Sequence, residues 1–284
     1  MTPDAATPPL PMPELRLGSL TLTAGRDKSG RPEGGDIHFR PGEITALMGP
    51  TGSGKSRFLA DIESLAAGDT PTGRRLLLNG LPPDPDIRFD LQGRLVAQLT
   101  QNMNFVLDMG VMDFLRTHAR SREAADPDRA ARRVFEAAVS LAGEPFGPDA
   151  QLTQLSGGQS RALMIADTAL LSWSPVLLID EIENAGVDKR RALDLLLATD
   201  KIVVMATHDP VLALAAGRRL VFAHGAVAAV LSRSPDESPW SERLEAMERE
   251  WSLIRAALRR GDPLPPLPPS DPACDKGAPV RGLT

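Results

Sequence analysis

Apolar runs of strand length alternate with segments of helical periodicity between the two ends of the chain. Short apolar runs predict buried strands, and apolar residues three and four positions apart predict helices that bury one face. The order of these elements predicts an α/β fold with an antiparallel portion near its start. The expected strands are 15–23, 44–48, 75–78, 176–179, 202–206 and 220–223, and the expected helices are 55–66, 111–120, 128–141, 161–171, 189–197 and 211–216.

A further helix is predicted near the end of the chain, at residues 241–260. Its apolar residues follow one another at spacings of three, four, three and four, and charged residues occupy the other positions; they are Leu244, Met247, Trp251, Ile254 and Leu258. A stripe of this kind is compatible with a dimer seam and with packing onto the helix's own domain.

Prolines are concentrated at both ends. Five of the 26 lie within residues 1–13 and seven within residues 261–284, so we expect both segments to be disordered or extended. The run Pro263–Pro269 favours a polyproline II helix. It is compatible with a solvated tail and with a ligand for an aromatic groove.

Composition and charge exclude several classes of function. The net charge of −5, from 32 basic and 37 acidic residues, gives the whole chain no electrostatic reason to bind nucleic acid. The single cysteine, Cys274, excludes an intrachain disulfide and a cysteine-bound zinc. No apolar run reaches the roughly 18–20 residues needed to cross a bilayer, and the start lacks the pattern of a signal peptide. We therefore expect a cytoplasmic protein.

A glycine-rich loop follows the strand predicted at 44–48 and opens the helix predicted at 55–66. Its glycines let successive backbone N–H groups point at one anion, and the following helix dipole adds to the field. We expect Lys55 to reach the β- and γ-phosphates of ATP and the Ser56 hydroxyl to bind Mg²⁺. The loop consists of Gly49, Pro50, Thr51, Gly52, Ser53, Gly54, Lys55 and Ser56.

Two acids follow the strand predicted at 176–179. Parallel strands open at their carboxyl ends onto a ligand crevice, so these acids are expected beside the phosphates. Asp180 is predicted to hold Mg²⁺ through water, and Glu181 to orient or deprotonate the attacking water.

A third motif lies between the loop and the acidic strand: Leu155, Ser156, Gly157, Gly158 and Gln159. With it, the chain resembles an ATP-binding cassette (ABC) ATPase over about residues 14–232. The resemblance implies a P-loop NTPase core, with a mostly parallel sheet flanked by helices, an N-terminal antiparallel β-subdomain and an inserted all-helical subdomain at about residues 102–172. In that family this signature segment binds the γ-phosphate of ATP held by the other subunit.

The resemblance assigns further roles by position. Gln101 corresponds to the glutamine that contacts magnesium, with Gln98 as an alternative. His208 resembles the histidine that contacts the γ-phosphate, and Asp188 the aspartate at the dimer contact. The implied domains are an ATPase domain at 14–235, the C-terminal helix at 240–260, and the two proline-rich ends.

The sequence departs from the family at two places. The family usually stacks adenine on an aromatic residue, but the chain has no Tyr and residues 20–31 contain no aromatic residue. Arg26 or Arg31 could stack on the base instead, or the base could be held loosely. The segment after Glu181 is one residue longer than usual and contains Glu183 and Asn184.

The resemblance implies a head-to-tail dimer, a homodimer or a heterodimer with a related ATPase, that closes on ATP and opens after hydrolysis. One expected function is the ATPase component of a membrane transporter, peripheral on the membrane, whose permease subunits dock near residues 102–109, at Met103, Phe105, Val106 and Met109. The alternative is a soluble ABC ATPase that remodels a cytoplasmic protein. A module that does not hydrolyse ATP is disfavoured because Glu181 is present.

Overall fold

The structure is a computed structural model that describes residues 17–85, 88, 95–100, 105–180 and 186–264. The chain divides into two units, residues 1–237 and 238–284, and each is described by itself. No helix in the described part of the chain is long and apolar enough to cross a membrane.

A six-stranded sheet, in the order β5-β6-β7-β3-β8-β9, forms the centre of the first unit. Five strands are parallel, and β9 pairs antiparallel with β8. The strands are β3 (Ile44–Met48), β5 (Val96–Leu99), β6 (Val176–Asp180), β7 (Ile202–Ala206), β8 (Arg218–Ala223) and β9 (Ala226–Ser232). The predicted α/β core is confirmed.

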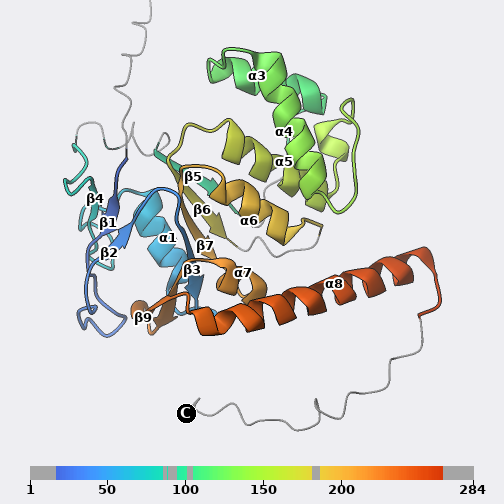
Figure 1. The fold of residues 1–284 in the computed structure, drawn as a ribbon. Helices are drawn as coiled ribbons and strands as arrows, with labels where there is room; N and C mark the ends of the chain where they lie inside the picture. Colours follow the sequence, from blue (N-terminus) through green and yellow to red (C-terminus); the bar gives the residue numbers. More distant parts are fainter. Residues whose placement is uncertain (1–16, 86–87, 89–94, 101–104, 181–185, 265–284) are drawn as a thin grey trace, which may run out of the picture. The chain divides into compact units, whose positions relative to one another are not determined.

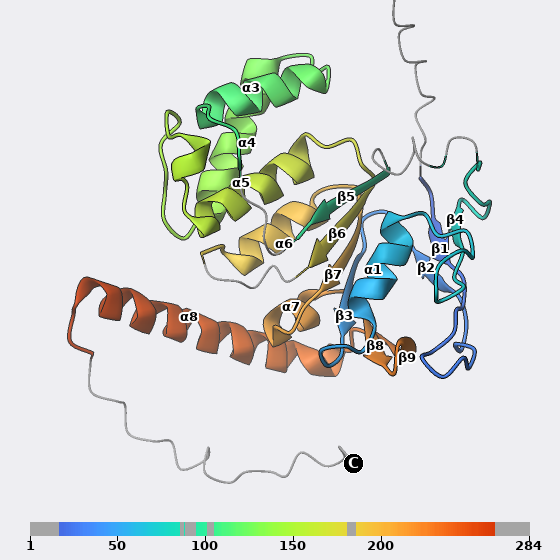
Figure 2. The same cartoon turned by 180° about the vertical axis from the view of Figure 1, so that it is seen from behind.

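Both faces of this sheet are buried, which explains the uninterrupted apolar runs of its strands. In β6, Leu177 and Ile179 belong to one hydrophobic cluster, whereas Val176 and Leu178 belong to a second. Helices α5 (Gly157–Leu170), α6 (Lys189–Leu197) and α7 (Pro210–Ala215) contribute to the first cluster, and α1 (Lys55–Glu63) to the second. Figures 1 and 2 show α1 on one side of the sheet and α5 and α6 on the other.

A separate three-stranded antiparallel sheet lies on the α1 side, in the order β2-β1-β4. It consists of β1 (Leu20–Leu22), β2 (Ile37–Phe39) and β4 (Leu76–Leu78). The antiparallel portion near the start is therefore confirmed. The first strand is shorter than the predicted 15–23, because the N–H groups of Gly18 and Ser19 donate to Asn79 Oδ1 (2.8 and 3.0 Å) rather than to a neighbouring strand.

An all-helical part is inserted between β5 and β6. Its helices α3 (Val111–Ser121), α4 (Pro127–Leu141) and α5 pack together through one apolar cluster that includes Leu115, Val134 and Leu163. Asp126 caps α4 by accepting from Arg129 N–H, and Pro127 stands at its first position, where no N–H is needed. A turn of 3-10 helix at Leu152–Gln154 leads into α5.

Helix boundaries differ from the prediction at α1 and α5. Helix α1 ends at Glu63 rather than Ala66, and Leu65 has a φ of 49°, which a helix cannot continue. Helix α5 begins four residues early, because a capping box between Ser156 and Gln159 satisfies its first backbone groups. In the second unit, α8 spans Ser238–Arg260, which confirms the predicted helix.

Candidate functional site

The glycine-rich loop joins β3 to the first turn of α1. Gly54 is the N-terminal cap of α1, with a φ of 114°. The first amides of a helix have no intrahelical acceptor, so those of Lys55, Ser56 and Arg57 are available to an anion. A Cβ on Gly54 would lie 2.8 Å from Gly225 Cα, so only glycine fits where the β8–β9 turn meets the loop.

The Lys55 side chain is buried and folds back over the start of this loop. Its Nζ donates to the carbonyl oxygens of Gly49 (2.6 Å) and Pro50 (3.2 Å). The ammonium group is therefore held above the same loop whose amides are available. This is the arrangement that phosphate oxygens bind.

The acidic strand and the histidine segment end beside the loop. Asp180 lies opposite Ala206 in the β6–β7 register, and β7 pairs in turn with β3, which leads into the loop. His208, two residues beyond Ala206, is exposed. Thus Asp180, His208 and the loop share one edge of the sheet. Glu181 and Gln101 lie outside the described residues.

The alternative glutamine, Gln98, lies within β5. In the orientation of its amide that satisfies both groups, its nitrogen donates to the Glu63 carboxylate at 2.8 and 3.1 Å. This contact, at the end of α1, gives Gln98 a structural role.

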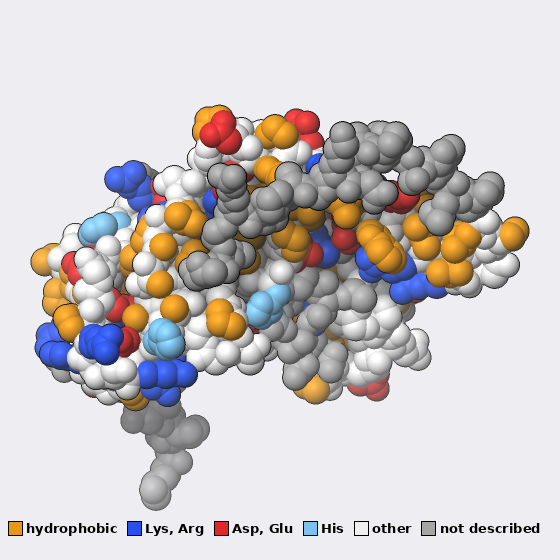
Figure 3. All heavy atoms as spheres, turned by 90° about the horizontal axis from the view of Figure 1, so that it is seen from below, with side chains coloured by type: hydrophobic (Ala, Val, Ile, Leu, Met, Phe, Trp, Pro, Cys, Tyr) orange, Lys and Arg blue, Asp and Glu red, His pale blue; other side chains and the backbone are white. Residues whose placement is uncertain are grey.

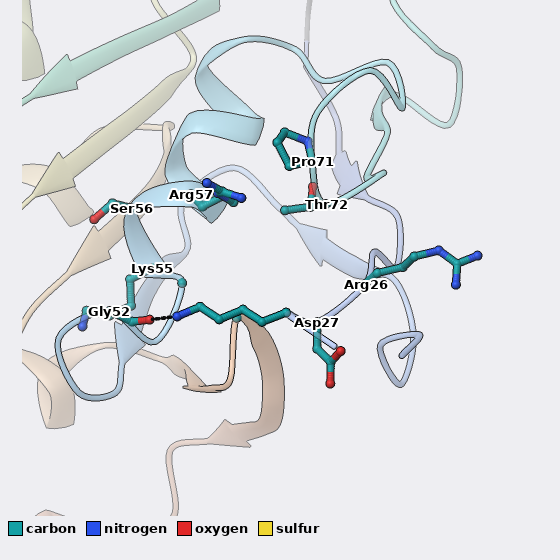
Figure 4. Close-up of a pocket in the computed structure, with 11 residues that line it drawn as sticks. Arg26, Asp27, Gly52, Lys55, Ser56, Arg57, Pro71 and Thr72 are labelled. Atoms are coloured by element: carbon teal, nitrogen blue, oxygen red, sulfur yellow. Dashed lines mark hydrogen bonds between the residues drawn. The ribbon is translucent and has the colours of Figure 1, made fainter. Parts of the chain in front are cut away.

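A pocket of about 690 Å³ opens against the loop (Figure 4). Four of its lining residues are cationic, one is acidic, and none of the lining residues that the structure describes is aromatic. The lining is suited to a polyanion, and no aromatic platform for a base is present in it. It consists of Arg26, Asp27, Lys28, Gly52, Gly54, Lys55, Ser56, Arg57, Pro71, Thr72 and Gly225.

Lys28 is the functional candidate that the sequence analysis missed. Its Nζ donates to the Gly52 carbonyl oxygen at 2.8 Å, and the dashed line in Figure 4 shows this contact across the pocket. Lys28 thereby places a second ammonium group on the phosphate loop. No motif marks it, since only the fold brings residues 26–28 against the loop.

The two arginines considered as base platforms are separated by the structure. Arg26 lines the pocket, but its guanidinium points away from the loop and donates to the Gly30 carbonyl oxygen at 3.1 Å (Figure 4). Arg31 does not line the pocket. The backbone N–H groups of Arg31 and Ser29 bind the Asp27 carboxylate and lower its pKa.

A buried ionic cluster lies behind the pocket. Arg74 donates to Glu33 through two nitrogens (2.5 and 2.9 Å) and to Asp61 of α1 (2.8 Å). The Thr72 hydroxyl of the pocket wall also donates to Asp61 (2.8 Å). Burial alone would raise the pKa of Glu33, but hydrogen bonds from Arg74 and from the Val227 N–H outweigh it and lower the pKa. The cluster joins α1 to the pocket wall.

The signature segment lies outside this pocket. Ser156–Gln159 are all described, and none of them lines it. Ser156 and Gly157 are exposed, whereas the Gln159 side chain donates within its own subunit to the carbonyl oxygens of Glu144 and Pro145 (both 3.3 Å). A turn with exposed N–H groups at a helix start can bind an anion that another molecule carries.

Two glycines bring the signature helix against the segment that follows the acidic strand. A Cβ on Gly158 would lie 2.8 Å from Gly186 Cα, and Gly186 has a φ of 105°. Beyond it, Asp188 caps α6 by accepting from Arg191 N–H at 3.1 Å. Lys189 donates to Asp209 at 2.5 Å, and Asp209 caps α7 directly after His208. The segments around Asp188 and His208 are therefore tied together.

A family profile described as ABC transporter matches residues 33–184, which is more than half of the chain. The matched range runs from Glu33 through the phosphate loop, the signature and the acidic strand. The chain belongs to the ABC transporter family.

Two curated ABC proteins show the extent of the likeness. An uncharacterised ABC transporter ATP-binding protein of Methanocaldococcus jannaschii is 44% identical over 251 residues, which cover 88% of this chain and 96% of that protein. A thiamine import ATP-binding protein of Brucella suis is 35% identical over 225 residues, covering 72% of this chain and 86% of that protein.

Among solved structures, a dimeric ATP-binding cassette bound to ADP and phosphate has a TM-score of 0.57 and 22% identity, covering 76% of this chain and 99% of that one. It supports the fold. With the family established, the chain is an ATP-binding and ATP-hydrolysing subunit and the ATPase component of a membrane transporter. The soluble alternative is not favoured by these relatives.

Proposed function

We propose that this ABC subunit drives transport by closing on a second ATPase subunit around two ATP molecules. The observation that carries the proposal is the separation of two anion sites on one chain. The phosphate loop lines the pocket with Lys55, whereas the exposed Ser156 and Gly157 lie outside it. A second subunit that supplies its own signature turn would complete each site, and a two-fold dimer does so twice.

Within one subunit, Lys55 and the loop amides would bind the β- and γ-phosphates, and Lys28 would add a second positive charge. The Ser56 hydroxyl, in the first turn of α1, and the Asp180 carboxylate, at the end of β6, are hard oxygen donors at the same edge of the sheet, a donor set that suits Mg²⁺ together with phosphate oxygens. Bound there, Mg²⁺ would neutralise charge that develops on the phosphates.

The attacking water would be handled by the residues that follow β6 and β7. Glu181 follows Asp180 directly and is assigned the orientation or deprotonation of the water. His208 is assigned to the γ-phosphate, with Gln101 contacting the magnesium ion. The contact between Lys189 and Asp209 supports the histidine assignment, because it holds the segment in which His208 lies.

The permease contact is proposed at residues 105–109. Val106 and Leu107 are exposed large apolar side chains, whereas Phe105 and Met109 pack against the core of the helical part. Val106 and Leu107 are therefore the side chains available to a permease, and the subunit would be peripheral to the membrane through that contact. Met103 lies outside the described residues.

The first test replaces the proposed water-activating residue. Glu181→Gln should keep ATP binding, nearly abolish hydrolysis and trap an ATP-bound dimer that size-exclusion chromatography resolves. Lys55→Ala is the matched variant on the binding side, with ATP affinity lower by about 10- to 150-fold, as expected for a charge-assisted contact. ATP hydrolysis by Glu181→Gln at the wild-type rate would show that another group activates the water.

The second test asks whether the sites are shared. Ser156→Arg should abolish hydrolysis and leave ATP binding to the isolated subunit unchanged. In a dimer of one Ser156→Arg subunit and one Lys55→Ala subunit, both defects fall in one site and the other site is intact. Mixing the two inactive variants should therefore restore part of the activity. Full activity of wild type at concentrations where sedimentation shows only monomer would refute shared sites.

A further inference from the structure

Helix α8 carries an uncovered apolar stripe along its length. Trp240 and Trp251 are 60% and 57% exposed, and Met247 and Leu258 are also largely exposed. With Leu244 and Ile254 these residues follow one another at spacings of four and three, which places them on one side of the helix. Among the residues of α8, all of which are described, Ser241 alone is buried. Large apolar side chains in such a row indicate a binding face.

The stripe is symmetric about position 249. Met247 and Trp251 lie two residues from it on either side, Leu244 and Ile254 five residues, and Trp240 and Leu258 nine residues. A second α8 that runs in the opposite direction would therefore place an apolar residue opposite every apolar residue of the first. A parallel copy would pair each residue with itself and does not depend on this symmetry.

Charge along α8 favours the same direction. Its first half, residues 238–248, has three glutamates and one arginine, whereas residues 249–260 have four arginines and one glutamate. An antiparallel partner brings the acidic half of each helix beside the basic half of the other, and a parallel partner opposes like charges. In the view of Figure 3, exposed apolar side chains lie next to basic ones.

We propose that α8 pairs antiparallel with α8 of a second copy of this chain, independently of ATP. The pair is an isologous two-fold contact, and its symmetry is compatible with the head-to-tail ATPase dimer. Three heptads form a modest interface, whose effect is to hold a second ATPase subunit at high local concentration. The stripe and the charge pattern lie outside the phosphate loop and the signature. A test of this contact is therefore independent of a test of the proposed ATP-dependent dimer.

The first test measures self-association of the full chain by sedimentation, without nucleotide and with a metal chelator, over a dilution series. Trp251→Glu should weaken the dimer at least about thirtyfold, as expected for a central Trp at an interface. Leu253→Glu is the matched control, because Leu253 is 72% exposed and lies off the stripe. It should associate as wild type does, and circular dichroism should show the same helix content for both variants.

The second test reads the direction of the pair by disulfide formation in a Cys274→Ser background. An antiparallel pair places position 244 against position 254 of the other copy. Leu244→Cys mixed with Ile254→Cys should therefore cross-link, and neither variant should cross-link with itself.

Three results would overturn the proposal: a wild-type monomer throughout the series, equal weakening by Leu253→Glu and Trp251→Glu, or self-cross-linking by each single cysteine. Binding of monomeric wild type to phosphatidylglycerol vesicles that Trp251→Glu abolishes would assign the stripe to a membrane surface instead.

Discussion

Replacing Arg74 by methionine should remove the cation that two buried carboxylates share. The Arg74 side chain is 1% exposed, and those of Glu33 and Asp61 are 4% and 2% exposed. Methionine fills much of the same volume, so the change removes charge and hydrogen bonds rather than packing. Arg74 also stacks over the Phe58 ring at 5.0 Å.

The free energy of unfolding should fall by about 4 kcal/mol or more, because breaking a buried ion pair costs about 3–5 kcal/mol and two carboxylates lose their partner here. Since a domain is stable by only about 5–15 kcal/mol, this loss would be evident in urea denaturation at pH 7. Arg116→Met is the control. Arg116 pairs with Asp128 at 2.8 Å on the surface, and its loss should cost less than about 1 kcal/mol.

The protonation of Glu33 gives the prediction a second readout. The pKa of Glu33 is lowered in the folded protein, so its contribution is present above the pKa of the unfolded state and is lost as the pH falls through the folded value. In Arg74→Met the buried carboxylates lose that support. The difference in the free energy of unfolding between wild type and Arg74→Met should therefore become smaller from pH 7 towards pH 4.

A further variant separates charge from shape. Arg74→Met combined with Glu33→Gln and Asp61→Asn removes all three charges and should recover most of the lost stability, since a neutral buried set has no unpaired ion. A loss below about 1 kcal/mol for Arg74→Met alone, or no recovery in the triple variant, would refute the argument that this cluster holds α1 to the pocket wall.

Three more outcomes are expected. Lys28→Met should weaken the binding of ATP and of GTP equally, by about two- to tenfold, whereas Arg31→Met, which removes a charge outside the pocket, should weaken neither. Competition binding of the two nucleotides checks this. The same measurement on wild type should give a preference for ATP over GTP below about tenfold, because none of the described residues that line the pocket is aromatic. Burial, together with repulsion from Arg122, lowers the pKa of Lys201 to about 8 from 10.5. Between these pH values the unfolded state holds one more proton than the folded state, so the free energy of unfolding should rise with pH. Lys201→Met should remove this rise, as measured by urea denaturation. Gly158→Ala should lower the unfolding free energy by about 1–3 kcal/mol because its Cβ meets the Gly186 backbone, whereas Gly157→Ala, with no atom within 4 Å of its Cβ, should not.

The fold could be predicted wherever a residue pattern is compatible with only one kind of secondary structure. Ile44–Met48, Ile202–Ala206 and Lys189–Leu197 have the bounds that the sequence predicts, because their apolar residues are buried and their ends are marked by turn or cap residues. The strands β2, β5 and β9 were not predicted. Ile37–Phe39 has only three residues, and Ala226–Ser232 is a largely exposed edge strand whose residues do not alternate between apolar and polar.

The site shows the same limit. The phosphate loop and the signature are contiguous motifs, so their residues could be named from sequence before their placement was known. The pocket wall could not, because Lys28, Thr72 and Gly225 come from three separate segments that only the folded chain brings together. The ionic cluster was missed for the same reason, since Glu33 and Arg74 are 41 residues apart.

The contact between Gly158 and Gly186 brings the backbone of the signature helix directly against the backbone of the segment before α6. With no side chain between the two backbones, a shift of the signature turn must push the segment that begins five residues after Glu181. In the proposed dimer with shared sites, that turn would contact the ATP of the neighbouring subunit, while Glu181 would act on the ATP of its own subunit. Hydrolysis of ATP in one site would then alter the position of the attacking water in the other, so the two sites would hydrolyse ATP alternately rather than independently.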